Sequence, residues 1–573
     1  MSVQREASVQ DQYSWLDYKE QFRNASSMRG SATRMKRSWV PEDEQRRLMA
    51  YRLLDAYYKN RSAEWMSREA DEDQKKNRRE YGDAFVLVET ALASLIGDDQ
   101  TVQVRHLEMP PEPRVDDEGN VVLDEMTQDP IIETPEDEAA IGLNSVLEDW
   151  MVKERFIQKM IECERNAVKL GDGVYVLGFD ERRGRPRISV WDPGMYFPDV
   201  EMQHLSDEDY PSTVCIAYEF VGREQPRETF VRRIMWWLAD VEEWTTAWSS
   251  SSDQVCWMSD GIWKLDDVNT DVFSFRDQDA VEWLIEPMML PIDFIPVVHI
   301  PNRVAGQEIY GTSVLGSILP ILDEMQACDT DIAATAALVG SPPLAISGGS
   351  LPKNDKGQID TYGPGMVFET GEGTATVLDT STCLDALMKL SDALSTRLSV
   401  NSRTPESLMG RVKPSEVPSG IALTLSFTPH GSLIREMRLV REEKYAILFR
   451  FVMRMMAVKD PQITAFGERE ANLKFGSFLP ADMQETSAMV VNLLSTQAIS
   501  LETAIGMLIA SGFQIDNVQE EIARIRSVDF TNALSAIDAT ADPNAGREYL
   551  GLDPLPLEDV EDEETDPTTK EQL

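Results

Sequence analysis

The longest uncharged run of this chain, Ile332 to Pro352, limits what the chain can fold into more than any other feature. A run of this length crosses a membrane only as a continuous helix, because backbone groups in lipid must be satisfied internally. Gly340, Pro342 and Pro343 interrupt the run. We therefore expect a soluble chain with no membrane partner, and the run needs another place in the fold.

Two segments with helical patterns flank the run. Val314–Val339 is rich in Ala, Leu and Ile, and Leu384–Val400 places its leucines on one stripe. Residues 359–378, between them, predict short strands with glycine turns. An antiparallel helix pair that carries the glycine-rich segment at its tip explains the run. A helical hairpin inside a globular domain is the alternative, and it explains the helices but not the tip.

The remaining patterns predict a mainly helical α+β fold. Residues 213–300 hold seven of the twelve tryptophans in short alternating runs, which indicates an antiparallel sheet with an aromatic core. Paired strands are expected at 173–179 and 187–191. Helices are expected within 41–81, 84–96, 139–170 and 480–525, and one long helix within 432–458, after Pro429 and Gly431.

Charge excludes a simple basic nucleic-acid binder. The chain has 55 basic and 99 acidic side chains, a net charge of −44. Residues 98–138 and 553–573 contribute −12 and −8 of it. We interpret the first segment as a solvated loop with a hairpin near 117–120, and the second as part of an acidic tail. Five scattered cysteines without a CxxC pair indicate a reducing compartment and no disulfide framework.

Catalytic motifs do not emerge from the sequence. The histidines His106, His204, His299 and His430 lie on unrelated segments, and no HExxH, GxxxxGK[ST] or GxGxxG occurs. We expect no enzyme activity, no cofactor and no metal. Clustered carboxylates such as Asp323/Glu324 and Asp329/Asp331 leave a metal-dependent nuclease or hydrolase as one alternative. An acidic interaction scaffold is another.

From Ile295 onward the order of segments resembles that of tailed-bacteriophage portal proteins. The resemblance rests on IPVVHIPNR at 295–303, on the stretch 310–349 and on SGIALTLSF at 419–427. Residues 489–526 are similar to the helical C-terminal region of the family. The likeness covers roughly residues 140–530 and lies in ordered architecture, while the segments 98–138 and 236–263 match nothing in the family.

This resemblance implies a ring oligomer of twelve subunits at one capsid vertex, with a wing, stem, clip and crown in each subunit. Double-stranded DNA would pass through the ring during packaging and ejection. The implied partners are the terminase large subunit, the head-tail connector protein and the major capsid protein or scaffold, and the implied location is the virion, after assembly in the host cytoplasm. The expected divisions are an N-terminal arm with helices (1–81), wing (82–312), first stem helix (313–339), clip (340–380), second stem helix (381–400), tunnel loop (401–419), long helix and return to the wing (420–479), crown (480–540) and acidic tail (541–573).

The tunnel loop implied by the resemblance supplies the candidate DNA-channel residues. Arg403, Arg411 and Lys413 lie in this polar, proline-marked loop, and we expect them to touch phosphates transiently. Salt bridges between subunits are the alternative role. The cations of the long helix are expected mostly on a solvated or subunit-facing surface. They are Arg435, Arg438, Arg441, Lys444, Arg450 and Arg454.

Overall fold

The structure is a computed structural model of the 573-residue chain. It divides into two units, residues 1–478 and 479–573. The residues that it describes are 39–65, 77–107, 112–113, 132–133, 137–199, 211–222, 228–240, 254–268, 270–304, 309–340, 344–347, 374–377, 381–410, 420–460, 463–464, 469–476, 483–496, 498–510, 513, 515, 521–522 and 524–525. They form a mixed helix-and-sheet fold with more residues in helices than in strands, which confirms the expected α+β class.

Four helices in the first part of the first unit supply much of its core. They are α3 (Glu42–Tyr58), α5 (Asp83–Ile96), α6 (Glu138–Glu154) and α7 (Phe156–Leu170), with a short 3-10 helix η1 (Ser62–Trp65) after α3. The pattern expected to give one helical stretch over 139–170 breaks at Arg155, whose φ of 52° is left-handed and redirects the chain. Leu143, Leu147, Phe156 and Met160 are fully buried on either side of this break.

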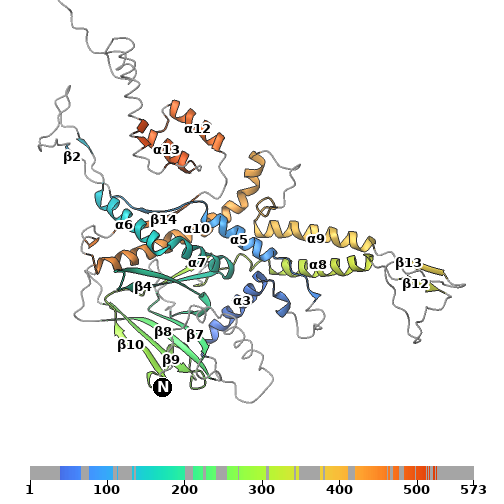
Figure 1. The fold of residues 1–573 in the computed structure, drawn as a ribbon, viewed down its shortest axis with the longest axis horizontal. Coiled ribbons are helices and arrows are strands. Elements are labelled where there is room, and N and C mark those ends of the chain that lie inside the picture. The colour runs from blue at the N-terminus through green and yellow to red at the C-terminus, as the bar shows by residue number, and fades with distance from the viewer. Residues whose placement is uncertain are drawn as a thin grey trace, which may run out of the picture. The chain divides into compact units, whose positions relative to one another are not determined.

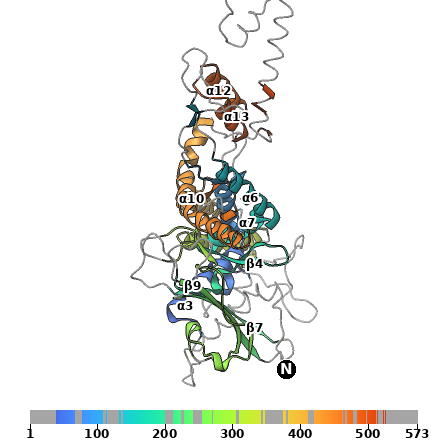
Figure 2. The ribbon, with the colours of Figure 1, turned by 90° about the vertical axis from the view of Figure 1, so that its left-hand side faces the viewer.

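A three-stranded antiparallel sheet lies at the centre of the unit. Its order is β11-β4-β5, with β4 Asp172–Asp180, β5 Arg185–Trp191 and β11 Val297–Pro301. The pairing of β4 with β5 confirms the expected strand pair. In both views α6, α7 and α10 (Gly420–Ala457) lie on one side of this sheet, and the larger sheet lies on the other (Figures 1 and 2).

The larger sheet confirms the prediction made from the tryptophans. Its five antiparallel strands run in the order β10-β9-β8-β7-β6. Trp236 and Trp263 are buried in it, and Trp237 stacks on Trp257 with ring centroids 6.2 Å apart. The strands are β6 Tyr196–Asp199, β7 Thr213–Val221, β8 Thr229–Asp240, β9 Gln254–Lys264 and β10 Glu282–Met289.

The acidic segment 98–138 is only partly a loop, so its interpretation as solvated is wrong for its first strand. β1 (Gln100–Val104) pairs with β14 (Ala471–Phe475), and Val102 and Val104 of β1 are buried. Further on, β2 (Glu112–Pro113) pairs with β3 (Ile132–Glu133). The expected hairpin tip at 117–120 lies outside the described residues.

Two long helices with a two-stranded tip follow β11. α8 (Leu319–Gly340) is succeeded by the antiparallel strands β12 (Leu344–Ser347) and β13 (Thr374–Val377), and α9 (Ser381–Ser402) leads back. Figure 1 shows α8 and α9 side by side with the two strands at their far end. The expected helix pair is thus present, but α8 begins at Leu319 rather than at 313 or 314, because turns occupy residues 314–318.

The long helix starts earlier than the sequence indicated. α10 begins at Gly420 and passes through Pro429, although proline removes an intrahelical hydrogen bond. The carbonyl that loses its donor belongs to Leu425, a residue that is 68% exposed, so water can take the place of the missing N–H. The placement of Pro429 and Gly431 before the helix was therefore wrong.

The second unit is helical where it is described. α12 (Met483–Ser495) and α13 (Leu501–Ala510) pack against each other, with Val490, Ala504 and Ile505 buried. This confirms the helical pattern expected within 480–525. The acidic tail lies outside the described residues.

Candidate functional site

The helix pair α8/α9 is buried only near its base, the end where α8 begins and α9 ends. The buried side chains of α8 are Leu322, Met325, Gln326 and Cys328, all in its first half. On α9 the leucine stripe is buried at Leu394 and Leu398, close to the end that returns to the core. The halves of the two helices beyond these residues have no buried side chain in the part of the chain that is described.

Large apolar side chains remain exposed on this pair. Leu338 is 51% exposed, Met388 54%, Leu390 42% and Val400 71%. These four side chains lie on both helices of the pair.

The charge of the pair is one-sided. α8 carries Asp323, Glu324, Asp329 and Asp331 and contains neither Lys nor Arg. α9 carries two charges of each sign, so it is neutral overall. One of these four carboxylates, Asp323, is paired with Arg78, which lies outside the helix pair.

The base of α8 is tied to the segment around α3 and residue 78. The Tyr57 hydroxyl donates to Asp323 over 3.0 Å, and the Ser62 hydroxyl donates to Gln326 over 2.6 Å. Arg78 bonds both Asp323 and Gln326. Burial and the Asp323 carboxylate raise the pKa of Tyr57, so this hydroxyl stays a donor.

Asp172, at the start of β4, binds the segment that connects β11 to α8. Its carboxylate accepts from the Gly311 N–H over 2.8 Å and lies 2.7 Å from His299 Nε2. The Tyr51 hydroxyl of α3 donates to its other oxygen. Burial and the Asp172 charge raise the pKa of Tyr51 far above its ordinary value. One buried carboxylate thus joins α3, β4, β11 and the chain that enters α8.

Two glycines let the backbones cross at this point. Gly171 has a φ of +110°, which favours glycine, and a Cβ on Gly311 would lie 2.3 Å from the Gly171 carbonyl oxygen and 2.5 Å from Asn302 N. The Asn302 N–H donates to the same carbonyl over 2.7 Å.

We expect Gly311→Ala to lower the free energy of unfolding by about 1–3 kcal/mol, the usual cost of overpacking. Backbone atoms would have to move to admit the methyl group. Gly316→Ala is the matched control, because its Cβ would meet nothing closer than Ser313 O at 3.6 Å. Urea denaturation of both variants checks the prediction, and equal stability of the two would contradict it.

Arg441 of α10 is fully buried, which corrects the expectation of a surface cation. Its guanidinium lies 2.8 Å from the Glu164 carboxylate of α7 and donates to the Asn302 carbonyl over 2.8 Å. The Tyr445 hydroxyl donates to Glu164 over 2.7 Å. Arg441 therefore fastens α10 to α7 and to the start of the connection into α8.

Arg438 was also predicted to lie on the surface, but its side chain is partly buried against the core. Its guanidinium donates to the carbonyls of Ser94, Leu95 and Gly476. Arg435, by contrast, is exposed as expected.

Arg403 follows α9 directly, with a left-handed φ of 55°. Its side chain is 49% exposed, and Nη1 lies 3.8 Å from Glu436 of α10. Arg303, which precedes α8, places its Nη1 4.0 Å from the same carboxylate. Glu436 thus lies near one residue of the segment that precedes α8 and one residue that follows α9. Arg411 and Lys413 lie outside the described residues.

The other candidate groups do not converge on a catalytic arrangement in the described residues. No three or more His, Cys, Asp or Glu side chains there are placed to hold a metal ion. His106 is exposed, His430 is buried and has its pKa lowered by burial, and His204 is not among the described residues. The five cysteines are free thiols.

Within the same residues, no helix is both long and apolar enough to cross a membrane. No protein-family model matches the chain, and no curated protein matches it.

Proposed function

We propose that this chain is the subunit of a phage portal, a ring at one capsid vertex through which double-stranded DNA is packaged and ejected. The observation that carries the proposal is the order of elements from β11 to α10. A projecting helix pair bears a two-stranded tip, Arg403 has a left-handed φ directly after α9, and the next helix, α10, is one long helix that packs in the core. In portal terms these are the stem, the clip, the start of the tunnel loop and the long helix.

The exposed apolar side chains of the helix pair support the ring. Leu338, Met388, Leu390 and Val400 would be covered by the pairs of neighbouring subunits if each subunit contacts the next through the same two faces. Such head-to-tail contacts close into a ring when the rotation per subunit divides a full turn. We propose twelve subunits.

The charges of the helix pair support a channel that does not bind DNA tightly. The exposed carboxylates Glu324 and Asp331 of α8 would repel the phosphates of passing DNA, while Arg403 offers a cation whose charge Glu436 partly balances. DNA that is repelled by most of the wall and touched weakly at a few points can slide. A basic channel would instead bind tightly at low salt.

The proposed partners follow the parts of the subunit. The tip formed by β12 and β13 and the ends of α8 and α9 would meet the terminase large subunit during packaging and the head-tail connector protein afterwards. The wing would meet the major capsid protein or scaffold. The chain would act in the virion as a structural part, with the ATPase supplied by terminase.

Neutralising Arg403, Arg411 and Lys413 together to alanine should alter the length or retention of packaged DNA while rings still assemble. The expected cause is the loss of the transient phosphate contacts. The measurement is the size of DNA protected in filled capsids, judged beside ring formation by the purified variant. Unchanged packaging would show that these cations do not touch DNA.

A further inference from the structure

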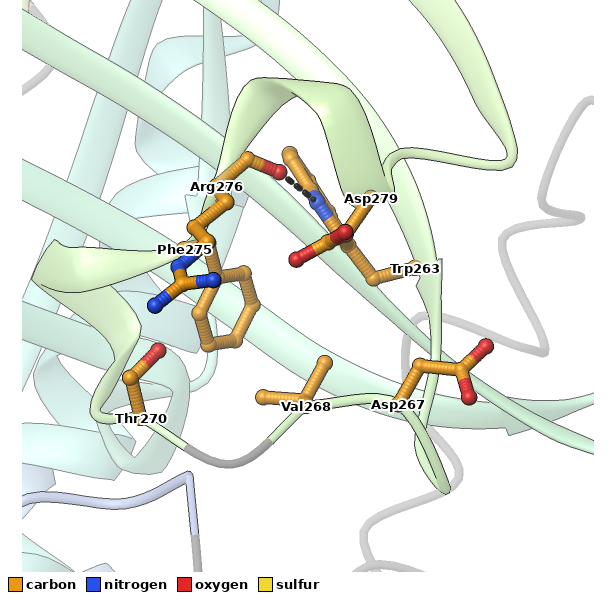
Figure 3. A pocket seen from close by; sticks show the side chains of 7 residues that line it. All are labelled: Trp263, Asp267, Val268, Thr270, Phe275, Arg276 and Asp279. Carbon is orange, nitrogen blue, oxygen red and sulfur yellow. Dashed lines mark hydrogen bonds between the residues drawn. The ribbon is translucent and has the colours of Figure 1, made fainter.

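A pocket on the large sheet selects no ligand by its charge. It lies between the end of β9 and the segment that carries two short 3-10 helices, η4 (Val272–Ser274) and η5 (Asp277–Asp279). Asp267, Asp279 and Arg276 all line it, so both signs of charge are present (Figure 3). Unsatisfied groups of one sign gather instead at the base of the helix pair.

Arg303 and Arg403 share one acceptor that neither of them reaches. Arg303 Nη1 lies 4.0 Å and Arg403 Nη1 3.8 Å from the same oxygen, Oε2 of Glu436. Both distances exceed the range of about 2.7–3.2 Å for an N–H donor in a hydrogen bond. In the part of the chain that is described, neither guanidinium makes a hydrogen bond, and Nε of Arg303 is a buried donor without an acceptor.

The chemistry of these donors points to an anion. Buried N–H groups nearly always have an acceptor, so two guanidinium groups with unfilled donors at one place need an explanation. The planar fork of five N–H groups in arginine matches the oxygens of phosphate and carboxylate groups. With one carboxylate between two arginines, the cluster also has a net charge of +1 in a chain of net charge −44.

The spacing of the two arginines favours a phosphate over a carboxylate. Because both Nη1 atoms lie within 4.0 Å of one oxygen, they are at most about 8 Å apart. Two charge-assisted bonds of about 2.8 Å each, joined across one tetrahedral phosphate group, span a distance of this order. A phosphate offers oxygens on several sides, whereas the carboxylate of Glu436 lies near both arginines and bonds neither.

The backbones that carry the two arginines are held in place. The Arg303 carbonyl accepts from the Thr312 N–H over 2.9 Å, and the Arg403 N–H donates to the Val400 carbonyl over 3.2 Å. The Glu436 side chain is 52% exposed, while that of Arg303 is only 23% exposed. The carboxylate can therefore turn toward solvent when another anion enters, and the arginines stay where they are.

We propose that Arg303 and Arg403 form a binding site for one phosphate group, and that an entering phosphate displaces the carboxylate of Glu436. The same chemistry suits a phosphate of a DNA backbone and free phosphate. The DNA source rests on the proposed portal function, whereas the site itself does not.

The test uses the full-length protein in a buffer without phosphate. Inorganic phosphate is titrated and followed by phosphorus NMR, and a fluorescently labelled short DNA duplex is titrated and followed by anisotropy. The site variant is Arg303→Gln with Arg403→Gln. The matched control is Arg182→Gln with Arg187→Gln, which removes two exposed arginines at the turn between β4 and β5 and on β5.

We expect saturable binding of phosphate, of the duplex or of both, weakened about tenfold or more in the site variant and less than about twofold in the control. Binding of phosphate alone would identify the free ion as the ligand, and binding of the duplex would identify the DNA backbone. Glu436→Gln should strengthen binding about threefold or more, because it removes the charge that competes for both arginines.

Glu436→Gln and the single variant Arg403→Gln change side chains that are about half exposed, so they test the site even if the double variant does not fold. Three results would overturn the proposal: no saturable binding of either probe, equal weakening by the site and control variants, or weaker binding after Glu436→Gln. Electron microscopy of the same samples separates the two proposals, because rings without site-dependent binding contradict only the phosphate site. Site-dependent binding without rings contradicts only the portal function.

Discussion

Replacing Arg441 with methionine is expected to lower the free energy of unfolding by about 3–5 kcal/mol, the range for breaking a buried ion pair from one side. The Glu164 carboxylate would remain at 0% exposure without its cation, and both oxygens of Asn302 would lose a donor. Since Arg441 joins α7, α10 and the connection into α8, the loss should be felt across the first unit. Urea denaturation followed by circular dichroism measures it.

Arg435→Met is the matched control, because Arg435 lies on the same helix and is exposed. It should change stability by no more than about 0.5 kcal/mol. Adding Glu164→Leu to Arg441→Met should recover the part of the loss that comes from the unpaired carboxylate, while the Asn302 oxygens stay without their donor. If Arg441→Met costs no more than Arg435→Met, the ion pair does not hold the helices together.

The second large effect is expected on the helix pair. The proposed portal function predicts rings of about 775 kDa, twelve subunits of 64.6 kDa each, and Leu338→Asp with Met388→Asp should convert such rings to single chains. Both side chains are about half exposed in one subunit, so the isolated fold should tolerate the change. In a ring the new carboxylates would be buried without partners, which costs several kcal/mol for each charge. Mass photometry measures the particle mass.

Val152→Asp serves as the control for this variant. Val152 lies on α6 and is 78% exposed, so it is more exposed than either residue of the helix pair. It should leave the rings intact. Rings that survive in the Leu338/Met388 variant, or that are lost equally in the control, would show that the apolar faces of the pair are not the subunit contact.

Patterns with a strong period predicted the existence of elements well. The leucines of α9, the alternating segments of the large sheet and the helices around Leu143 and Met160 all appear where their spacing indicated. Each of these elements buries one regular face, so the spacing of its own apolar residues shows whether it is a helix or a strand.

Features that depend on distant partners were missed. The strand β1 was interpreted as loop because its partner β14 lies more than 360 residues further along the chain. The start of α10 was predicted too late because proline usually ends or precedes a helix. Whether a helix tolerates an internal proline depends on the surroundings of the carbonyl that loses its donor, which the local sequence does not give. The hydrogen bonds of Asp172 come from Tyr51, His299 and Gly311, which lie on three distant segments, so no local spacing in the sequence predicts them.

The buried ion pair left a signal that was overlooked. Arg441 follows Met437 and precedes Tyr445 and Leu448, all buried, at the spacing of one helix face. Glu164 likewise lies between Met160 and Val168 on the buried face of α7. A single charge within an apolar stripe, of opposite sign on each of two helices, predicts that the two meet, because an unpaired buried charge is too costly to keep.

The most direct test of the proposed portal function is negative-stain electron microscopy of the purified full-length protein. The proposal predicts rings with a central hole, with twelve-fold symmetry in averaged end views. Discrete single subunits, or compact oligomers without a hole, would contradict it.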